Sequence, residues 1–545
     1  MTAMPYRRFL CAAAALALAG CPGHKTSQPP SGPGSPASAT GPNRLVVLLV
    51  IDQWPAWAFE HKRPMLVGGG FERLLREGEW HRGRHPSPAT LTAPGHALLG
   101  TGEPPAGSGI LANQWWHRDL EKIVKSVEDP DGPVSSARWL RVPALGDAIA
   151  AAGTGAKAVS VSLKDRAAIL MLGRSGLAIW YDKTKVTWTA KEVPPWLAAH
   201  AAAHPIAAHL RDVWTPLDPA KLAQLSGIAD NAPGELGESG FGPTFPHAAA
   251  DTKDPAEAIN AMPIGNELVL GTALAAIDGE KLGADDVPDL LAVSLSAHDL
   301  VGHGWGHESW EMWDMTLRLD QQLAAFLAAL DAKVGPGRWS LLVTSDHGAA
   351  PMTEVARGGR ITTESLKDAA NRAAIAELGP GEWIASAKYP TVFLSAAARA
   401  KPAKDLPVVM KKIMYALRSF PGIERVGLTT DFAGRCDTRT GDAFEICMML
   451  DPERSGEIFY MPRRGWVLHD AADPTATAHG SGNDYDRFVP VIMLPPKRTP
   501  HAPLEKVDDA TIYMVRISTV LAHWLGVTPP TSLPREPQPP PAPAP

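Results

Sequence analysis

Side chains that can bind metal ions or phosphate occur in short motifs that lie far apart in this 545-residue chain. They comprise three acids, a threonine, two cations and three histidines, in the order Asp52, Thr92, Lys164, Arg166, Asp299, His303, Asp346, His347 and His479. Carboxylates mixed with imidazoles suit Zn²⁺, whereas a purely Mg²⁺ site has less need of histidine. The set could therefore perform two-metal hydrolysis of a phosphate ester, with the cations binding the phosphoryl oxygens.

Buried strands would bring these distant residues together. The run Leu45–Ile51 is continuously apolar, which is typical of a parallel strand covered on both faces, and the first acid of the set follows it. Apolar runs at 290–295 and 339–344 lead in the same way to Asp299 and Asp346. Because the carboxyl ends of parallel strands meet at one edge, the sequence predicts an α/β fold with a central, mostly parallel sheet flanked by helices.

Other segments complete the predicted fold. The apolar run 488–494 follows His479, but Pro490 suggests an irregular or edge strand. Helical spacing extends from about 309 to 330, and a last helix is expected from about 508 to 525, before a glycine that can act as a C-cap.

The strand–helix alternation also suggests how the domains are organised. It is interrupted at about 120–280 and at about 355–470. We expect these two stretches to be cap insertions in one catalytic domain that spans 44–527.

The ends of the chain differ from its body. Two arginines precede an apolar run at 9–19 that is too short to span a bilayer, as in a secretory signal. The following Leu-Ala-Gly-Cys sequence, which ends at Cys21, resembles a bacterial lipobox; the alternative is an ordinary signal peptide with a chance cysteine. We expect a signal peptide over 1–21, a linker over 22–43 and a Pro-rich tail over 528–545. The protein would be exported, and periplasmic or anchored to the outer membrane by lipid on Cys21.

Composition limits the possible partners. Hydrophobic residues make up 45% of the chain, charged residues 20%, and the formal net charge is -6, so there is no basic excess and no nucleic-acid partner is expected. Of the four cysteines, only Cys436 and Cys447 lie outside the export segment. An exported location favours a disulfide between them over two free thiols.

The segment Thr92-Ala93-Pro94-Gly95-His96 places a hydroxyl where a helix would begin, a position that favours an anion. Contact with a metal ion would favour the alkoxide and so make Thr92 a nucleophile. Two alternatives are that Thr92 is only an N-cap and that the neighbouring Thr90 takes the role.

Two further motifs could supply metal ligands. Asp299 and His303 are four residues apart, and so could bind one ion from a single helical turn, while Asp346 and His347 are adjacent at a strand end. His479 could be the third ligand of the first pair, which would leave one position open.

Two cations could bind the phosphate. Lys164 and Arg166 are two residues apart, so in an extended segment both would point to the same face. The alternative is a solvated pair that flanks Asp165.

In this order the motifs resemble the alkaline phosphatase superfamily, over about residues 45 to 525. More narrowly, they are similar to the secreted bacterial alkaline phosphatases with a threonine nucleophile, close to the nucleotide pyrophosphatases and phosphodiesterases. The resemblance implies two Zn²⁺, one held by Asp299, His303 and His479 and the other by Asp52, Asp346, His347 and the nucleophile Thr92. It also implies that the phosphoryl oxygens are bound by Asn113, Lys164 and Arg166.

Charge favours a small-molecule phosphate monoester as substrate. Two Zn²⁺ contribute about +4, and three aspartates with a threonine alkoxide about −4, so Lys164 and Arg166 would face the roughly −2 charge of a monoester. The alternatives are a phosphodiesterase or nucleotide pyrophosphatase on the same scaffold, or an inactive metal- or phosphate-binding lipoprotein. A sulfatase is disfavoured, because those enzymes make formylglycine from Cys or Ser, and this chain has Thr92.

Overall fold

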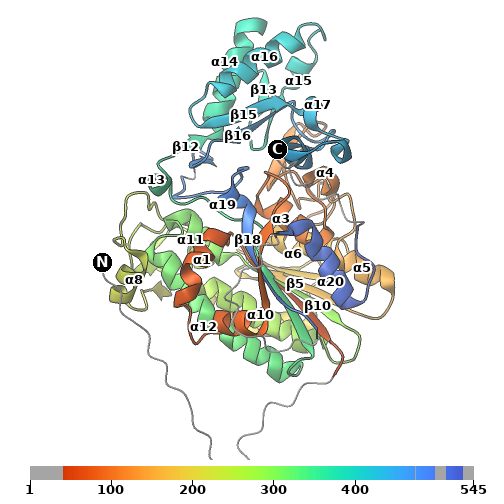
Figure 1. The fold of residues 1–545 in the computed structure, drawn as a ribbon, viewed down its shortest axis with the longest axis vertical. Helices are drawn as coiled ribbons and strands as arrows, with labels where there is room; N and C mark the ends of the chain where they lie inside the picture. Colours follow the sequence, from red (N-terminus) through yellow and green to blue (C-terminus); the bar gives the residue numbers. More distant parts are fainter. Residues whose placement is uncertain (1–40, 473, 497–510, 532–545) are drawn as a thin grey trace, which may run out of the picture. The chain divides into compact units, whose positions relative to one another are not determined.

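The computed structural model describes residues 41–472, 474–496 and 511–531. The predicted signal peptide, the predicted lipidation site at Cys21, most of the predicted linker and most of the Pro-rich tail lie outside these residues. A nine-stranded sheet has the order β19-β2-β18-β11-β1-β10-β5-β6-β7 (Figure 1). In that order the strands span Ile512–Tyr513, Glu79–Arg84, Phe488–Leu494, Trp339–Thr344, Leu45–Ile51, Asp289–Leu295, Ala158–Ser162, Leu177–Asp182 and Thr187–Ala190.

The middle of this sheet is parallel, as the sequence predicted. β1 pairs in parallel with β10 along its whole length and with β11 along nearly all of it. β5 pairs in parallel with β10, and β6 with β5, while β18 and β7 are antiparallel to their neighbours β11 and β6. The predicted α/β class with a mostly parallel sheet is confirmed.

Alternate residues of β1 enter two different apolar cores, which explains why the whole strand is apolar. Leu45, Val47, Leu49 and Ile51 pack with helices α10 (Pro263–Glu280) and α12 (Trp310–Lys333). The residues between them pack on the other face with the helices α3 (Thr92–Thr101), α5 (Leu145–Ala152), α6 (Asp165–Leu172) and α20 (Ile517–Leu525). Figure 1 shows the two helical layers on either side of the sheet.

Three sequence expectations need correction. Residues 158–190, which we expected within an insertion, form β5, α6, β6 and β7 of the main sheet instead. β5 escaped notice because its sequence, Ala-Val-Ser-Val-Ser, alternates apolar and polar residues although all five are buried. β18 is an interior strand: its pairing with β11 stops at Ile492, so Pro490 lies beyond the β11 ladder and costs it no hydrogen bond.

The last helix begins later in the chain than the sequence predicted. α20 begins at Ile517 and not near 508, because residues 512–513 pair with β2 as β19 and a 3₁₀ turn over Met514–Arg516 follows. It ends as expected at Gly526, whose φ of 70° is left-handed.

A second layered unit, which we call the cap, lies within the stretch expected as the second insertion. Its sheet has the order β13-β14-β16-β15, with strands Ile384–Ser386, Thr391–Leu394, Ile458–Pro462 and Ile423–Leu428. Helices α14 (Thr363–Leu378) and α16 (Leu406–Arg418) pack with this sheet around a separate apolar core (Figure 1).

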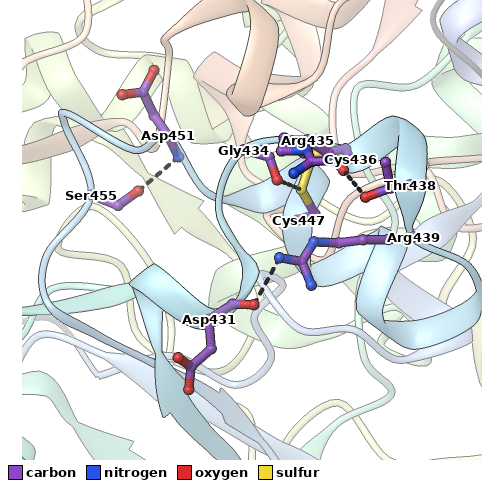
Figure 2. Close-up of a disulfide and its surroundings, with 9 residues drawn as sticks. All are labelled: Asp431, Gly434, Arg435, Cys436, Thr438, Arg439, Cys447, Asp451 and Ser455. Atoms are coloured by element: carbon purple, nitrogen blue, oxygen red, sulfur yellow. Dashed lines mark hydrogen bonds between the residues drawn. A yellow bond between two sulfur atoms is a disulfide. The ribbon is translucent and has the colours of Figure 1, made fainter.

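The predicted disulfide is confirmed within the cap. Cys436 and Cys447 are bonded, with their Cα atoms 5.6 Å apart (Figure 2). Cys447 lies on α18 (Gly441–Met449). On the same helix, Glu445 pairs with Arg84 of β2 and with Arg487 before β18, so the disulfide-bonded segment is tied to the main sheet.

The other helices are α1 (Ala56–Lys62), α2 (Gly70–Glu77), α4 (Pro105–Ser108), α7 (Pro195–Ala203), α8 (Pro219–Ser226), α9 (Pro255–Ala258), α11 (Ala297–Trp305), α13 (Thr353–Ala356), α15 (Ala396–Arg399), α17 (Thr429–Phe432) and α19 (Asp484–Arg487). The short strands are β3 (Gln114–His117), β4 (Lys122–Lys125), β8 (Val213–Trp214), β9 (His247–Ala248), β12 (Gly359–Thr362) and β17 (Trp466–His469). Among the described residues, no helix has the length and apolar character needed to cross a bilayer.

Candidate active site

The predicted metal ligands meet where neighbouring parallel strands end. Asp52 directly follows β1, Asp299 and His303 lie on α11 after β10, and Asp346 and His347 follow β11. Two groups of three ligand atoms, each within 4.8 Å of one another, consist of Asp299, His303 and His479, and of Asp52, Asp346 and His347. The structure therefore assembles the same two sets of three that the sequence indicated.

The three imidazoles are held in the orientation that a metal ion requires. Each Nδ1 bonds to a backbone carbonyl oxygen, at 3.0 Å for His303, 2.7 Å for His479 and 3.0 Å for His347. Each carbonyl accepts the proton of Nδ1, so that with a metal ion bound the Nε2 lone pair would face the ion. The Nε2 atoms of His303 and His479 are 3.3 Å apart, and that of His347 is 3.5 Å from Asp52 Oδ1.

The acids of the site are short of partners. Asp52 Oδ1 and Asp346 Oδ2 are buried and make no hydrogen bond of good geometry among the described residues; histidine nitrogens approach them no closer than 3.5 Å and 3.2 Å, from His347 and His96 respectively. Lys164 Nζ lies 2.7 Å from Asp52 Oδ2 and 2.5 Å from Asp299 Oδ2, so one lysine pairs with two buried carboxylates. Uncompensated buried charges are costly, and divalent cations at the two groups would supply the missing positive charge. The donor set fits two metal ions.

The pKa values reflect this crowding. Burial, together with Asp299 and Asp346, raises the pKa of Asp52 well above its ordinary value. Burial has the same tendency at Asp299, but Lys164 and His303 outweigh it and hold the pKa of Asp299 well below the usual range. Burial lowers the pKa of His303, but Asp299 outweighs it and brings this pKa to about 9. The cluster is therefore strongly coupled electrostatically.

Thr92 lies at the edge of the second group. It is the first residue of α3, its side chain is 1% exposed, and its Oγ1 is 3.4 Å from His347 Nε2. Leu91 occupies the N-cap position, so Thr92 is not the N-cap. The hydroxyl of Thr90 donates to two backbone carbonyls, which leaves Thr92 as the hydroxyl that faces the ligands.

The predicted phosphate-binding residues adjoin the same groups. Asn113 Oδ1 accepts a hydrogen bond of 2.8 Å from the backbone N–H of Ala93, so the Asn113 amide can still donate. The expectation that Lys164 and Arg166 share an extended segment is wrong: Lys164 is the extended N-cap of α6, and Arg166 lies in its first turn. Arg166 Nε is buried without a hydrogen-bond partner among the described residues.

A cavity of about 220 Å³ opens beside the first group. His303, His479 and Asn113 line it on the side of the main sheet, while Lys388 and Asp470 line it from the cap. Sequence reasoning gave no role to these cap residues, because nothing in their local sequence marks them.

Two other contacts of the site were not predicted. His96 Nδ1 is 3.2 Å from Asp346 Oδ2, and the only sequence signal was its spacing of four residues from Thr92 on a helix. Gln53, next to Asp52, contacts both ligand groups.

Comparison with known proteins agrees with this geometry. The family model for "Type I phosphodiesterase / nucleotide pyrophosphatase" matches residues 46–485. Over 477 residues the chain is 32% identical to the alkaline phosphatase PafA of Elizabethkingia meningoseptica, covering 83% of this chain and 86% of that protein. The chain belongs to the alkaline phosphatase superfamily.

Further relatives and solved structures resemble this chain in sequence or in fold. The alkaline phosphatase PhoV of Synechococcus elongatus is 30% identical over 480 residues, covering 83% of this chain and 85% of that protein. The crystal structure of wild-type PafA superposes with a TM-score of 0.80 at 28% identity, covering 92% of this chain and 99% of that one. Murine ectonucleotide pyrophosphatase/phosphodiesterase 5 shares the fold, with a TM-score of 0.52 at 14% identity, covering 91% of this chain and 97% of that one. The matching family model is named for phosphodiesterases and the relatives of about 30% identity are named alkaline phosphatases, so the geometry of the site must decide between the two activities.

Proposed function

We propose that this protein is an alkaline phosphatase, which hydrolyses small-molecule phosphate monoesters through a phosphothreonine at Thr92 in a two-zinc site. The observation that carries the proposal is the position of Thr92 Oγ1, 3.4 Å from His347 Nε2 at the start of a helix. The helix N-terminus and the adjoining ligand groups both favour negative charge on that oxygen.

Zinc ions held by the two groups would supply positive charge that favours loss of the Thr92 proton and stabilises the oxygen of the departing alcohol. Thr92 Oγ then attacks phosphorus in line with the ester bond. The Oγ–P bond forms while the ester P–O bond breaks, and the alcohol takes up a proton from water. Water then cleaves the phosphothreonine and releases phosphate. Throughout, the Asn113 amide, Lys164 and Arg166 hold the other phosphoryl oxygens.

Preference for a monoester follows from charge. Arg166 is partly buried, and its Nε is a buried donor with no hydrogen-bond partner among the described residues. A monoester offers two negative charges to such a donor, while a diester has one charge and a substituent in place of an oxygen. Charge-assisted hydrogen bonds contribute about 1.5–3 kcal/mol, which corresponds to roughly 10- to 150-fold in rate.

The test compares p-nitrophenyl phosphate with bis(p-nitrophenyl) phosphate on metal-loaded protein. Wild type should strongly prefer the monoester, Thr92→Ala should lose turnover, and Arg166→Met should lose monoesterase activity roughly 10- to 150-fold with little change for the diester. Arg138→Met is the matched control, because this side chain is 46% exposed and pairs with Asp131. A wild-type preference for the diester, or full activity in Thr92→Ala, would contradict the proposal.

We also propose that the protein is exported and anchored by lipid on Cys21, as the lipobox-like sequence suggests. Cells grown with labelled fatty acid should yield labelled protein from wild type and unlabelled protein from Cys21→Ser. Equal labelling of the two would contradict the anchor.

A further inference from the structure

Gln53 contacts both metal-ligand groups from a single position. Its backbone N–H donates to Asp346 Oδ1 at 3.3 Å, and its side-chain Nε2 donates to Asp299 Oδ1 at 2.8 Å. Asp299 and Asp346 belong to different groups. Gln53 is fully buried, so these bonds do not compete with water.

Two neighbours fix the orientation of the Gln53 amide. His307 Nε2 lies 3.1 Å from Gln53 Oε1, so the oxygen faces His307 and the NH₂ faces Asp299. Gly302, on α11 between Asp299 and His303, makes room for this oxygen: a Cβ there would overlap Gln53 Oε1 and lie 3.3 Å from His307 Nε2.

The backbone of Gln53 is strained in the conformation that allows these contacts. Its φ of 58° is in the left-handed region, which costs a residue with a Cβ roughly 1 kcal/mol or more. The conformation turns its N–H toward Asp346 and its side chain toward Asp299. Glycine would adopt this φ without cost, whereas glutamine is strained by it. The presence of glutamine at this position therefore indicates that its side chain has a role of its own.

We propose that Gln53 is a positioning residue that couples the two metal-ligand groups, with Gly302 and His307 holding its amide. Outer partners of metal ligands typically change metal affinity by roughly 10- to 100-fold. Gln53→Gly allows the same left-handed backbone conformation, keeps the backbone N–H that bonds to Asp346, and removes the side chain with its amide. We expect one of the two bound zinc equivalents to weaken roughly 10- to 100-fold, and Gly302→Ala to have a similar effect by displacing the amide.

The experiment measures zinc alone binding to the metal-stripped full chain by competition with a chromophoric chelator. Because no substrate is present, a failure of the proposed phosphatase activity would not affect the result. In the double variant, Gly302→Ala should cause no further loss of zinc affinity beyond that of Gln53→Gly, because Gln53 Oε1, which the new Cβ would overlap, is absent. Gln322→Ala, which removes a partly exposed glutamine amide on α12, is the control and should bind zinc as wild type does. Unchanged affinity in Gln53→Gly, or additive losses in the double variant, would overturn the proposal.

A second, independent observation concerns the cavity of about 220 Å³. It touches His303 and His479 of the first ligand group, and its lining includes no member of the Asp52 group. Since Thr92 lies beside the Asp52 group, in-line displacement would send the departing alcohol toward this cavity. This step rests on the proposed function.

The outer wall of the cavity carries a balanced ion pair. Lys388 Nζ contacts the two oxygens of Asp470 at 2.8 and 2.7 Å, and Thr363 donates to Asp470 Oδ1 at 2.9 Å. The side chains of Lys388 and Asp470 are 22% and 42% exposed, so both are accessible to a ligand. Leu91 and Leu468 add apolar surface. The cavity is smaller than the roughly 300–1,000 Å³ of sites for drug-sized ligands, so it suits a single ring.

We infer that Lys388 and Asp470 form a subsite for the alcohol half of the substrate, and that this alcohol is neutral and hydroxyl-rich, as in a sugar phosphate. The pair offers donors and acceptors to hydroxyl groups, and it offers no net charge to a carboxylate. An anionic alcohol therefore gains nothing from the pair.

The test compares kcat/KM for glycerol phosphate, whose alcohol is neutral, with that for phosphoglycolate, whose alcohol is anionic. Asp470→Asn leaves Lys388 unpaired and should shift the ratio toward phosphoglycolate by roughly two- to five-fold, while Lys388→Met should shift it the other way. Lys183→Met breaks the exposed ion pair with Glu257 and is the matched control, which should leave the ratio unchanged. If the ratio of the two kcat/KM values is unchanged, or shifts in the same direction in Asp470→Asn and Lys388→Met, the proposed subsite is wrong. Absence of turnover in wild type would instead contradict the proposed function.

Discussion

Replacement of Glu311 by glutamine should change how the stability of this protein depends on pH. Glu311 lies in the first turn of α12 and is fully buried. Its Oε1 is 3.0 Å from His247 Nε2, and its Oε2 has no hydrogen-bond partner among the described residues. Burial, reinforced by Glu235, Asp230 and Asp314, raises the pKa of Glu311 to about 10. Burial also lowers the pKa of His247 to about 4, so near neutral pH the pair is a neutral acid bonded to a neutral imidazole.

The sign and size of the effect follow from proton linkage. In the unfolded chain Glu311 loses its proton near its ordinary pKa of 4.5, whereas the folded protein keeps that proton up to about pH 10. Between these values the native state holds one more proton than the unfolded state, so the free energy of unfolding falls by about 1.4 kcal/mol per pH unit as pH rises. The stabilisation is fully present below the unfolded pKa and is lost progressively toward the folded one.

Glu311→Gln preserves the shape of the neutral acid and cannot ionise. Urea unfolding of both proteins, between about pH 6 and about pH 8, should give a stability difference that grows by about 3 kcal/mol in favour of the variant. If the stability difference instead stays constant over this range, Glu311 is already ionised in the folded protein and its pKa is not raised by burial.

Three further outcomes are expected. Replacing Cys436 and Cys447 by serine opens a short loop and should lower the free energy of unfolding by roughly 3 kcal/mol on the chain-entropy argument; an unchanged unfolding midpoint would contradict it. Gly95→Ala places a Cβ against the backbone of Asp346 and should shift α3, so kcat/KM should fall roughly 100-fold; wild-type kinetics would show that this close approach is unimportant. Chelation should lower the melting temperature, and zinc at about 100 times its Kd should restore about 2.7 kcal/mol of stability; identical melting curves would count against tight metal sites.

The parallel core of the fold could be predicted because burial on both faces leaves a simple pattern. A continuous apolar run marked β1, and largely apolar runs marked β10 and β11; the acids that follow these strands marked the edge where the ligands meet. β5 could not be found in this way, because its serines are buried and bond to other polar groups: Ser160 donates to the carbonyl of Ala168, and Ser162 bonds to Ser296.

Residues that act through tertiary contacts left no local signal. Gln53 is an ordinary polar residue in the sequence, and its role depends on a positive φ and on an opening provided by Gly302. Lys388 and Asp470 are 82 residues apart, and only folding of the cap unites them. The ligand sets were predictable because metal binding demands particular residue types, whereas an amide or an ion pair can occur anywhere on a surface.

Acid-quenched samples show whether Thr92 becomes phosphorylated during turnover. Metal-loaded enzyme is mixed with p-nitrophenyl phosphate, quenched in acid and digested, and the peptide that contains Thr92 is examined by mass spectrometry. We expect phosphate on Thr92 in the zinc-loaded protein and none in the chelated protein. Sustained phosphate release with no phosphate on Thr92, or with phosphate on a different residue, would contradict this expectation.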